Sequence, residues 1–311
     1  MKTSIELERH NLSGATMGTR YSAVFYAPVD FNDAALANAL FEAVDRVDRQ
    51  MSTWKPDSDL NRLNAAAIGV WVDIPPELGR VLAEGVRITR LCGGAFEIGI
   101  GDLVAQNGFG ATPGAPDPVA LAAREGHVRV TAITMLELTP DRRRARRTGP
   151  ISLDLSGIAK GFGVDELARV LNQSGIENWL VSIDGEVRVR GNKPDGEFWA
   201  IALERPEMGS RSALGVLELS DMAVATSGNY RYVRQDGESM VSHTMDPRTG
   251  QPLRNNLASV SVLAKTCMEA DALATAFLVM GEDAGPKMAH VLGVEAIFIP
   301  QDGHVLSNVS V

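Results

Sequence analysis

Apolar residues recur at helical spacing in four stretches of the chain. Residues 32–49 carry four of them on one face, Leu36, Leu40, Val44 and Val47. Residues 76–92 and 164–171 show the same spacing, and residues 268–280 are apolar on almost every side. Repeats of three and four residues predict amphipathic helices over the first three stretches and a buried helix over the fourth.

Strand-like stretches are more numerous than helical ones. Alternating or short apolar runs predict strands near residues 15–25, 95–104, 127–138, 151–155, 179–183, 184–191, 198–203, 214–219, 258–264 and 293–300. Polar, glycine- or proline-containing segments at residues 51–61, 107–118 and 242–250 predict loops. Because strands follow strands with few regular strand–helix–strand alternations, the order predicts the α+β class and not a doubly wound sheet.

Composition and charge exclude several classes of protein. The 311 residues are 45% hydrophobic and 22% charged, which is ordinary for a globular chain, and the net charge of -9 argues against a general nucleic-acid surface. No apolar stretch reaches the ~20 residues of a membrane helix, and the first residues lack a signal-like apolar run. We expect a cytoplasmic protein as the sequence stands, or a periplasmic one if a leader has been removed. Cys92 and Cys267 lack CxxC spacing, which predicts buried thiols and no zinc site.

The stretch ISLDLSGIAKGFGVDELARVL, residues 151–171, is the first candidate site. It predicts a strand, a bend with three glycines, and then a helix. Glycine lets the backbone approach a ligand, and the first N–H groups of a helix have no partner inside it, so such a bend can bind an anion. Lys160 adds a positive charge. The alternative is a tight structural connection with a surface lysine, and the stretch alone favours that alternative.

The apolar helix over residues 268–280 holds the second candidate. Asp271 and Thr275 are four residues apart and therefore share one helix face. A carboxylate in so apolar a helix is costly to bury without a cation or several donors, and two oxygen ligands suit Mg²⁺ beside a phosphate. Alternatively, Asp271 stabilises the helix N-terminus and Thr275 bonds to the backbone. The spacing does not decide between these interpretations.

Two loop residues and a basic run complete the candidates. His243 lies among turn formers, with Asp246 three residues on, and a neutral imidazole is a competent base for a hydroxyl. Trp54 stands in a polar loop, where it could fill the core or stack on a planar ligand; the core interpretation is the commoner one. The arginine-rich run at 142–147 follows a Pro-Asp turn, which indicates a solvated hairpin tip.

Seven motifs occur in the order of a known family. They are MGT at 17–19, STWKPDSDLNRLN at 52–64, GGAFEIGIGDLV at 93–104, DLSGIAKGFGVD at 154–165, ATSGNY at 225–230, HTMDPRTGQP at 243–252 and CMEADALATAFLVMG at 267–281. Together they resemble the ApbE family, the Mg²⁺-dependent FAD:protein FMN transferases. The resemblance implies an α+β, T-fold-like domain over residues 12–311 after an N-terminal tail of residues 1–11. FAD would lie between two closely packed lobes.

The resemblance also implies an activity and a set of site residues. Such enzymes move FMN from FAD to a Thr or Ser hydroxyl of an acceptor flavoprotein, through a phosphoester bond, and release AMP. Asp271, Thr275 and the Gly157 carbonyl match the Mg²⁺ ligands, and His243 matches the base for the acceptor hydroxyl. The FAD-contacting positions match Met17, Trp54, Ala95, Phe96, Glu97, Asp154, Lys160 and Met245.

Two other functions fit much of the same pattern. One is a Mg²⁺-dependent FAD pyrophosphatase, in which water replaces the protein hydroxyl and free FMN and AMP are released. The other is a non-catalytic FAD-binding protein, although storage of FAD needs no base such as His243. The chain departs from the usual family residues at Glu97, where Asp is common, at Asp184, where Gly is frequent, and at Trp54, where Tyr is common. We expect no nucleic-acid partner, and no transmembrane segment in the chain.

Overall fold

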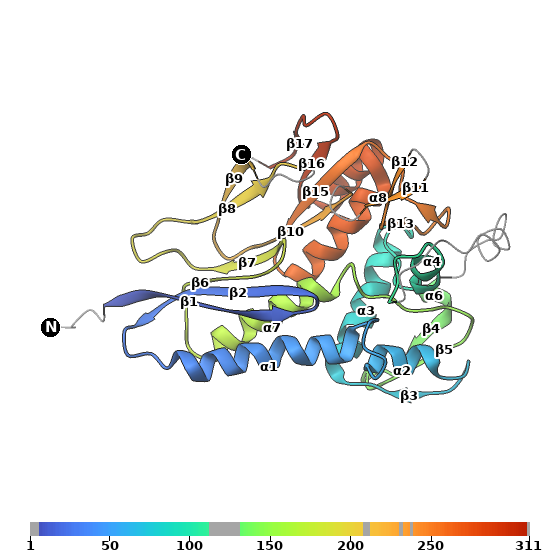
Figure 1. The fold of residues 1–311 in the computed structure, drawn as a ribbon, viewed down its shortest axis with the longest axis horizontal. Coiled ribbons are helices and arrows are strands. Elements are labelled where there is room, and N and C mark those ends of the chain that lie inside the picture. Colours follow the sequence, from blue (N-terminus) through green and yellow to red (C-terminus); the bar gives the residue numbers. More distant parts are fainter. Residues whose placement is uncertain (1–5, 112–130, 208–211, 230–232, 237–238, 310–311) are drawn as a thin grey trace.

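The computed structural model describes residues 6–111, 131–207, 212–229, 233–236 and 239–309. An antiparallel sheet forms the centre of the molecule (Figure 1). In spatial order its strands are β1 (Leu7–Thr16), β2 (Thr19–Pro28), β6 (Trp179–Ile183), β7 (Glu186–Arg190), β10 (Ala223–Gly228), β15 (Leu257–Ala264), β16 (Glu295–Pro300) and β17 (Leu306–Ser307). Residues 7–11, expected in the N-terminal tail, pair with β2 as the first half of β1.

Helices cover one face of the sheet, and a strand pair covers part of the other. Three helices pack on one face: α1 (Asp33–Met51), α7 (Ala159–Gln173) and α8 (Cys267–Leu292). On the other face, β8 (Trp199–Glu204) pairs with β9 (Ala213–Leu219) over a smaller apolar cluster. Strand β2 shows how alternation serves both faces, because Ala23 and Phe25 belong to the helix-side core while Val24 and Tyr26 pack on the β8–β9 side.

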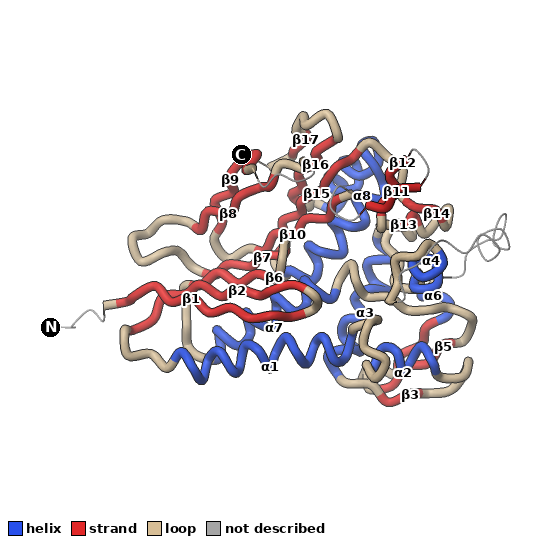
Figure 2. The backbone as a smooth tube through the Cα atoms, viewed as in Figure 1, coloured by secondary structure: helices blue, strands red, loops and turns tan. Residues whose placement is uncertain are grey.

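A second group of elements lies beyond the α1–α8 side of the sheet (Figure 2). It contains α2 (Asp59–Ala65), α3 (Pro76–Leu91), α4 (Gly101–Gln106), α6 (Ala132–Met135), and the small sheet of β3 (Val72–Asp73), β5 (Arg144–Arg147) and β4 (Leu136–Leu138). Two further pairs are β11 (Val233–Asp236) with β12 (Ser239–Ser242), and β13 (Met245–Asp246) with β14 (Gln251–Pro252). The mixture of helices and antiparallel sheets confirms the α+β class.

Helices α1 and α3 follow their sequence signals closely, whereas α7 begins five residues before the expected 164. Asn32 caps α1 by accepting a hydrogen bond from the Ala35 N–H, and Gly93 and Gly94 take positive φ just after α3 ends. Helix α8 extends past the expected end at Met280 because it continues across a kink at Gly281, where φ is 81°. None of the described helices combines the length and apolar character needed to cross a bilayer.

Several strand predictions were wrong in detail. The expected strand at 15–25 is broken by a hairpin turn at Met17 and Gly18, which both have positive φ; residues 19–25 beyond the turn lie in β2, as expected. Residues 151–155 alternate in burial as expected but form no strand ladder; the Asp154 N–H donates to the Ile98 carbonyl and the Leu153 N–H to the Asn64 side chain. Among the described residues no strand pairs with this segment, so its alternating burial does not make it a strand.

Two other segments also differ from expectation. Residues 95–100 form bends and irregular backbone in place of the expected extended run, and helix α4 follows. In the expected strand at 127–138, α6 precedes the three residues of β4, and residues 127–130 lie outside the described part of the chain. The same holds for most of the glycine/proline loop at 107–118, whose residues 112–118 are not described. The arginine run forms the predicted hairpin with β4, but only Arg142 and Arg143 lie in its exposed turn. Arg147, at the end of β5, is half-buried and donates to the Leu63, Ile151 and Ala66 carbonyls.

Candidate functional site

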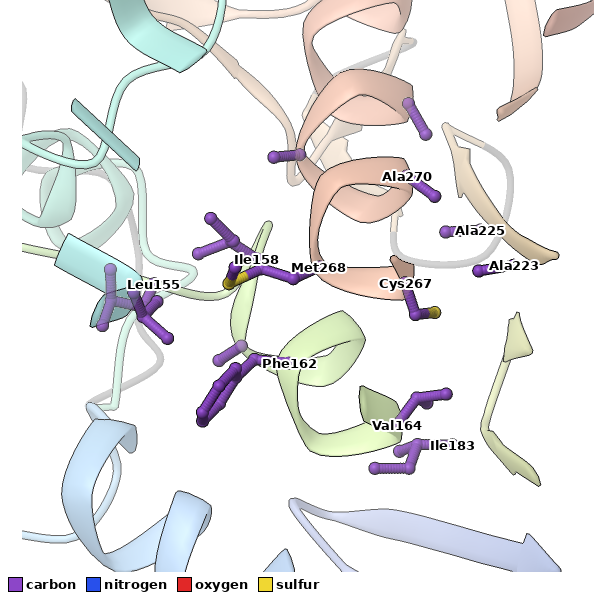
Figure 3. Packing of buried hydrophobic residues seen from close by; sticks show 14 of the residues in the cluster. Leu155, Ile158, Phe162, Val164, Ile183, Ala223, Ala225, Cys267, Met268 and Ala270 are labelled. Atoms are coloured by element: carbon purple, nitrogen blue, oxygen red, sulfur yellow. The ribbon is translucent and has the colours of Figure 1, made fainter. Parts of the chain in front are cut away.

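The N-terminal turns of α7 and α8 meet, and this junction brings the two main candidate segments together. The Gly161 N–H, in the first turn of α7, donates to Asp271 Oδ2 on α8 at 2.9 Å. A Cβ atom on Gly161 would lie 2.3 Å from the Cys267 carbonyl oxygen and 2.8 Å from the Asp271 Cβ. Only glycine permits this approach. Figure 3 shows Met268, at the start of α8, beside Ile158 at the start of α7.

The glycine bend also reaches Thr275. A Cβ atom on Gly157 would lie 3.2 Å from Thr275 Oγ1 and 3.2 Å from the Phe96 ring. The Thr275 hydroxyl exchanges a hydrogen bond of 2.9 Å with Ser227 Oγ, at the end of β10. Gly157, Asp271 and Thr275 therefore lie in one place, as the metal hypothesis requires. Ser227 was not among the sequence candidates, although it stands in the ATSGNY motif.

Lys160 sits among carboxylates at the same junction. Its Nζ donates to Glu186 Oε1 at 2.8 Å and lies 4.0 Å from Asp184 Oδ2. Burial would lower the pKa of Lys160, but Glu186, Asp271 and Asp184 outweigh it and raise the pKa. Lys160 is thus a permanent cation at neutral pH, and it is too closely paired to be the surface lysine of the alternative interpretation.

Burial disfavours the ionised form of the carboxylates at this junction. Burial raises the pKa of Glu186 to about 7, with Lys160 opposing the rise and Asp271 adding to it. Burial likewise raises the pKa of Asp271, against the opposing effects of Lys160 and the Gly161 N–H. Glu186 Oε2 is buried and has no hydrogen-bond partner among the described residues. Three carboxylates facing one ammonium make a site that favours an added cation.

The donor set fits a hard divalent cation that keeps open positions. Within the described part of the chain, no group of three or more His, Cys, Asp or Glu residues could hold a metal by itself. Any cation here would take the Asp271 carboxylate together with neutral oxygens, such as the Thr275 hydroxyl and the Gly157 carbonyl. Mg²⁺ commonly binds one or two carboxylates, with phosphate and water completing its shell.

Two predicted FAD contacts lie close to the bend. Asp154 is half-buried, and its Oδ1 accepts the Ser156 N–H at 2.7 Å. Met17, in the turn between β1 and β2, approaches α7: a Cβ atom on Gly163 would lie 3.1 Å from its Cε. Both residues therefore border the α7 N-terminus, and their contact with FAD stays a prediction.

The segment from Ala95 to Glu97 forms a buried wall of the site. Ala95 and Phe96 are buried, and Phe96 faces Gly157 as described above. Glu97 Oε1 accepts the Gly99 N–H at 2.7 Å and the Ala132 N–H at 2.9 Å. These bonds give the Glu97 carboxylate a role in holding the backbone of this wall, and a direct contact with FAD stays a prediction.

Trp54 is 60% exposed, so its interpretation as a core residue is wrong. The Asn61 side chain donates to the Thr53 carbonyl at 3.0 Å and to the Lys55 carbonyl at 2.9 Å, which fixes the loop on both sides of the indole. A large ring held out to solvent by an ordered loop suits stacking on a planar ligand.

His243 lies half-buried between β12 and β13. The Thr244 N–H donates to Ser242 Oγ at 3.0 Å, and the following Met245 is buried. Further along the segment, Arg248 pairs with Asp246 and donates to the Val279 carbonyl at 3.2 Å. Val279 lies one turn after Thr275, so the segment that carries His243 and Met245 is tied to α8.

Comparisons with known sequences find a family model and close relatives. A family model described as the ApbE family matches residues 17–298. A relative from Vibrio cholerae named FAD:protein FMN transferase is 39% identical over 296 residues, covering 94% of this chain and 87% of the relative. A relative of the same name from Haemophilus influenzae is 35% identical, covering 96% and 89%.

Solved structures show the same fold. The flavin transferase ApbE from Vibrio cholerae superposes with a TM-score of 0.86 at 36% identity, covering 97% of each chain. The apo form of a flavinyl transferase ApbE from Pseudomonas stutzeri gives a TM-score of 0.86 at 31% identity, covering 97% of this chain and 95% of that one. The chain therefore shares its overall fold with these flavin transferases.

Proposed function

Because the chain belongs to the ApbE family, we propose that it is an FAD:protein FMN transferase that acts on an acceptor flavoprotein. The reaction would join the FMN phosphorus of FAD to a Thr or Ser hydroxyl oxygen of the acceptor. The bond from that phosphorus to the bridging oxygen would break, and AMP would leave. The observation that carries the proposal is the α7–α8 junction, where Gly161 and Asp271 bond across 110 residues of sequence beside Lys160 and Thr275.

Asp271, Thr275 and the Gly157 carbonyl are the residues that would hold Mg²⁺. When bound, the ion would neutralise charge on the pyrophosphate, which is the principal need in displacement at phosphorus. Burial of Asp271 supports this assignment, since a buried carboxylate gains most from a nearby cation.

The chain's own residues would supply the remaining steps. Lys160, held by Glu186, presents a fixed positive charge beside the nucleotide site. His243 would take the proton of the acceptor hydroxyl, which is a poor nucleophile until a base removes that proton. Trp54 would stack on the adenine or the isoalloxazine ring, because it is exposed on an ordered loop.

The test is an incubation with FAD and Mg²⁺, with and without the acceptor protein of the Vibrio cholerae relative. Flavin fluorescence on the denatured acceptor, with AMP in equal amount, supports transfer. Free FMN and AMP without labelling would instead make the protein an FAD pyrophosphatase. FAD retained without either product would make it a binding protein. An acceptor whose target hydroxyl residue is replaced by alanine is the control for non-covalent flavin.

A further inference from the structure

We propose that Asp165 is a positioning residue for the site, through a reciprocal arrangement in which α7 and α8 cap each other's N-termini. The inference rests on the proposed function, because it assigns Asp165 the task of placing Asp271 for the cation. Asp165 lies on α7, one turn after Gly161, and contacts neither the bend nor Thr275 in any described hydrogen bond.

The α8 N-terminus receives its acceptors from α7. The first N–H groups of a helix have no partner inside the helix. The Cys267 N–H donates to Asp165 Oδ1 and the Met268 N–H to Asp165 Oδ2, each at 3.0 Å. The third, from Glu269, goes to Oγ1 of Thr266, the helix's own cap, at 3.3 Å. Asp165 therefore satisfies two donors that α8 could not satisfy alone.

The α7 N-terminus receives its acceptor from α8 in return. Ile158 occupies the cap position of α7 and supplies no side-chain hydrogen bond. The Gly161 N–H donates instead to Asp271 Oδ2. Asp271 lies one turn after Cys267, as Asp165 lies one turn after Gly161. The two sets of bonds are thus one helical turn apart and fix both helices against sliding.

In this arrangement Asp271 can cap α7 and also bind a cation. Among the described residues only its Oδ2 is engaged in a hydrogen bond, so Oδ1 remains for a cation. Asp165 is in turn anchored by Arg188 of β7, whose Nη1 lies 2.7 Å from Asp165 Oδ1. Arg188 thus connects the helix pair to the sheet. A shift of α8 by a fraction of an ångström would misplace Asp271 and Thr275 together, and loss of such outer supports typically weakens metal binding about 10- to 100-fold.

The experiment compares Asp165→Asn with Thr266→Val in the full chain. Both variants remove acceptors from the N-terminus of α8, so both should lower the melting temperature. The measured quantity is the Kd of Mn²⁺ in the presence of FAD, from the free Mn²⁺ signal in electron paramagnetic resonance. We expect Asp165→Asn to raise this Kd about 10- to 100-fold and Thr266→Val to change it less than about threefold.

Equal Kd values for the two variants would overturn the inference, because α8 capping alone would then explain both. If Asp165→Asn does not fold, Arg188→Gln takes its place, since it leaves the helix bonds of Asp165 intact and removes only the anchor. A raised Mn²⁺ Kd in Arg188→Gln supports the inference, and a value equal to that of Thr266→Val contradicts it. Wild-type protein that binds neither FAD nor Mn²⁺ would count against the proposed function instead.

Discussion

Replacing Gly161 by alanine tests whether the close approach of α7 and α8 is essential. The new Cβ would lie 2.3 Å from the Cys267 carbonyl oxygen and 2.7 Å from its carbon, so the two backbones must separate. Overpacking of this kind costs about 1–3 kcal/mol, and a weakened bond from Gly161 to the Asp271 carboxylate costs about 1.5–3 kcal/mol more. The higher helix propensity of alanine stabilises α7 by about 1 kcal/mol relative to glycine. The net loss is about 1.5–5 kcal/mol.

That loss converts to a measurable shift in melting temperature. At about 2.1 cal/mol/K per residue, unfolding of the 311-residue chain has an entropy of about 0.65 kcal/mol/K. The Gly161→Ala variant should therefore melt about 2–8 °C below wild type in a circular-dichroism scan, and should need more Mg²⁺ for half-maximal activity.

The matched control is Gly215→Ala in β9. A Cβ atom there meets no other atom within 4 Å, and its backbone needs no positive φ. Its melting temperature should stay within about 1 °C of wild type, since exposed changes are usually worth less than about 0.5 kcal/mol. The close-packed junction would be refuted if Gly161→Ala had the same melting temperature as Gly215→Ala and kept the wild-type Mg²⁺ requirement.

Four further outcomes are expected. His243→Ala should lower FMN transfer roughly 10²–10⁴-fold while FAD binding by fluorescence quenching is retained; transfer at the normal rate would remove the base assignment. Asp271→Ala should abolish activity and its Mg²⁺ dependence together, and activity that still rises with Mg²⁺ would place the ion elsewhere. Trp54→Ala should leave the melting temperature unchanged but weaken FAD binding about 5- to 150-fold, the range of one stacked base; an unchanged Kd would exclude stacking. The pKa of Glu186 is raised from 4.5 to about 7 in the folded state, so its contribution to stability is lost as pH rises through about 7. Glu186→Gln should therefore make the free energy of unfolding depend less on pH between pH 5 and 8. An unchanged pH dependence would contradict its assignment to Glu186.

The helices and several candidate site residues were predictable because their signals are local, whereas only the resemblance to the ApbE family assigned those residues to a metal and FAD site. Apolar spacing located α1 and α3, and the four-residue step from Asp271 to Thr275 placed both on one face of α8. Lys160 and Gly157 were identified from the glycine motif, and the structure brings both to that face. Such patterns depend on helix geometry, which holds in any tertiary context.

The start of α7 was predicted wrongly because of its glycines. Gly161 and Gly163 suggested a bend that lasts to Val164, but α7 already begins at Ala159. Their function is close packing: Gly161 against the Cys267 carbonyl, and Gly163 against Ile183 and Met17. Glycine is compatible with both a turn and a tight helix crossing, and the sequence does not say which partner approaches.

Residues that act through long-range contacts were missed. Asp165 closes the DLSGIAKGFGVD motif and Glu186 shortly follows Asp184, but neither was assigned a role, because their roles follow from partners 102 and 26 residues away. Ser227 likewise becomes notable only through its bond to Thr275, 48 residues on. A single chain without tertiary structure gives no indication of such pairs, although a buried charge at Asp165 in an otherwise apolar helix face invites the search for one.

The most direct test of the account is a crystal structure with FAD and Mn²⁺, in which anomalous scattering locates the ion. We expect one strong peak at the α7–α8 junction, about 2.0–2.3 Å from oxygens of Asp271, Thr275 and Gly157, with the FAD pyrophosphate on its open side. A peak away from both Asp271 and Thr275, or a pyrophosphate bound elsewhere, would contradict it.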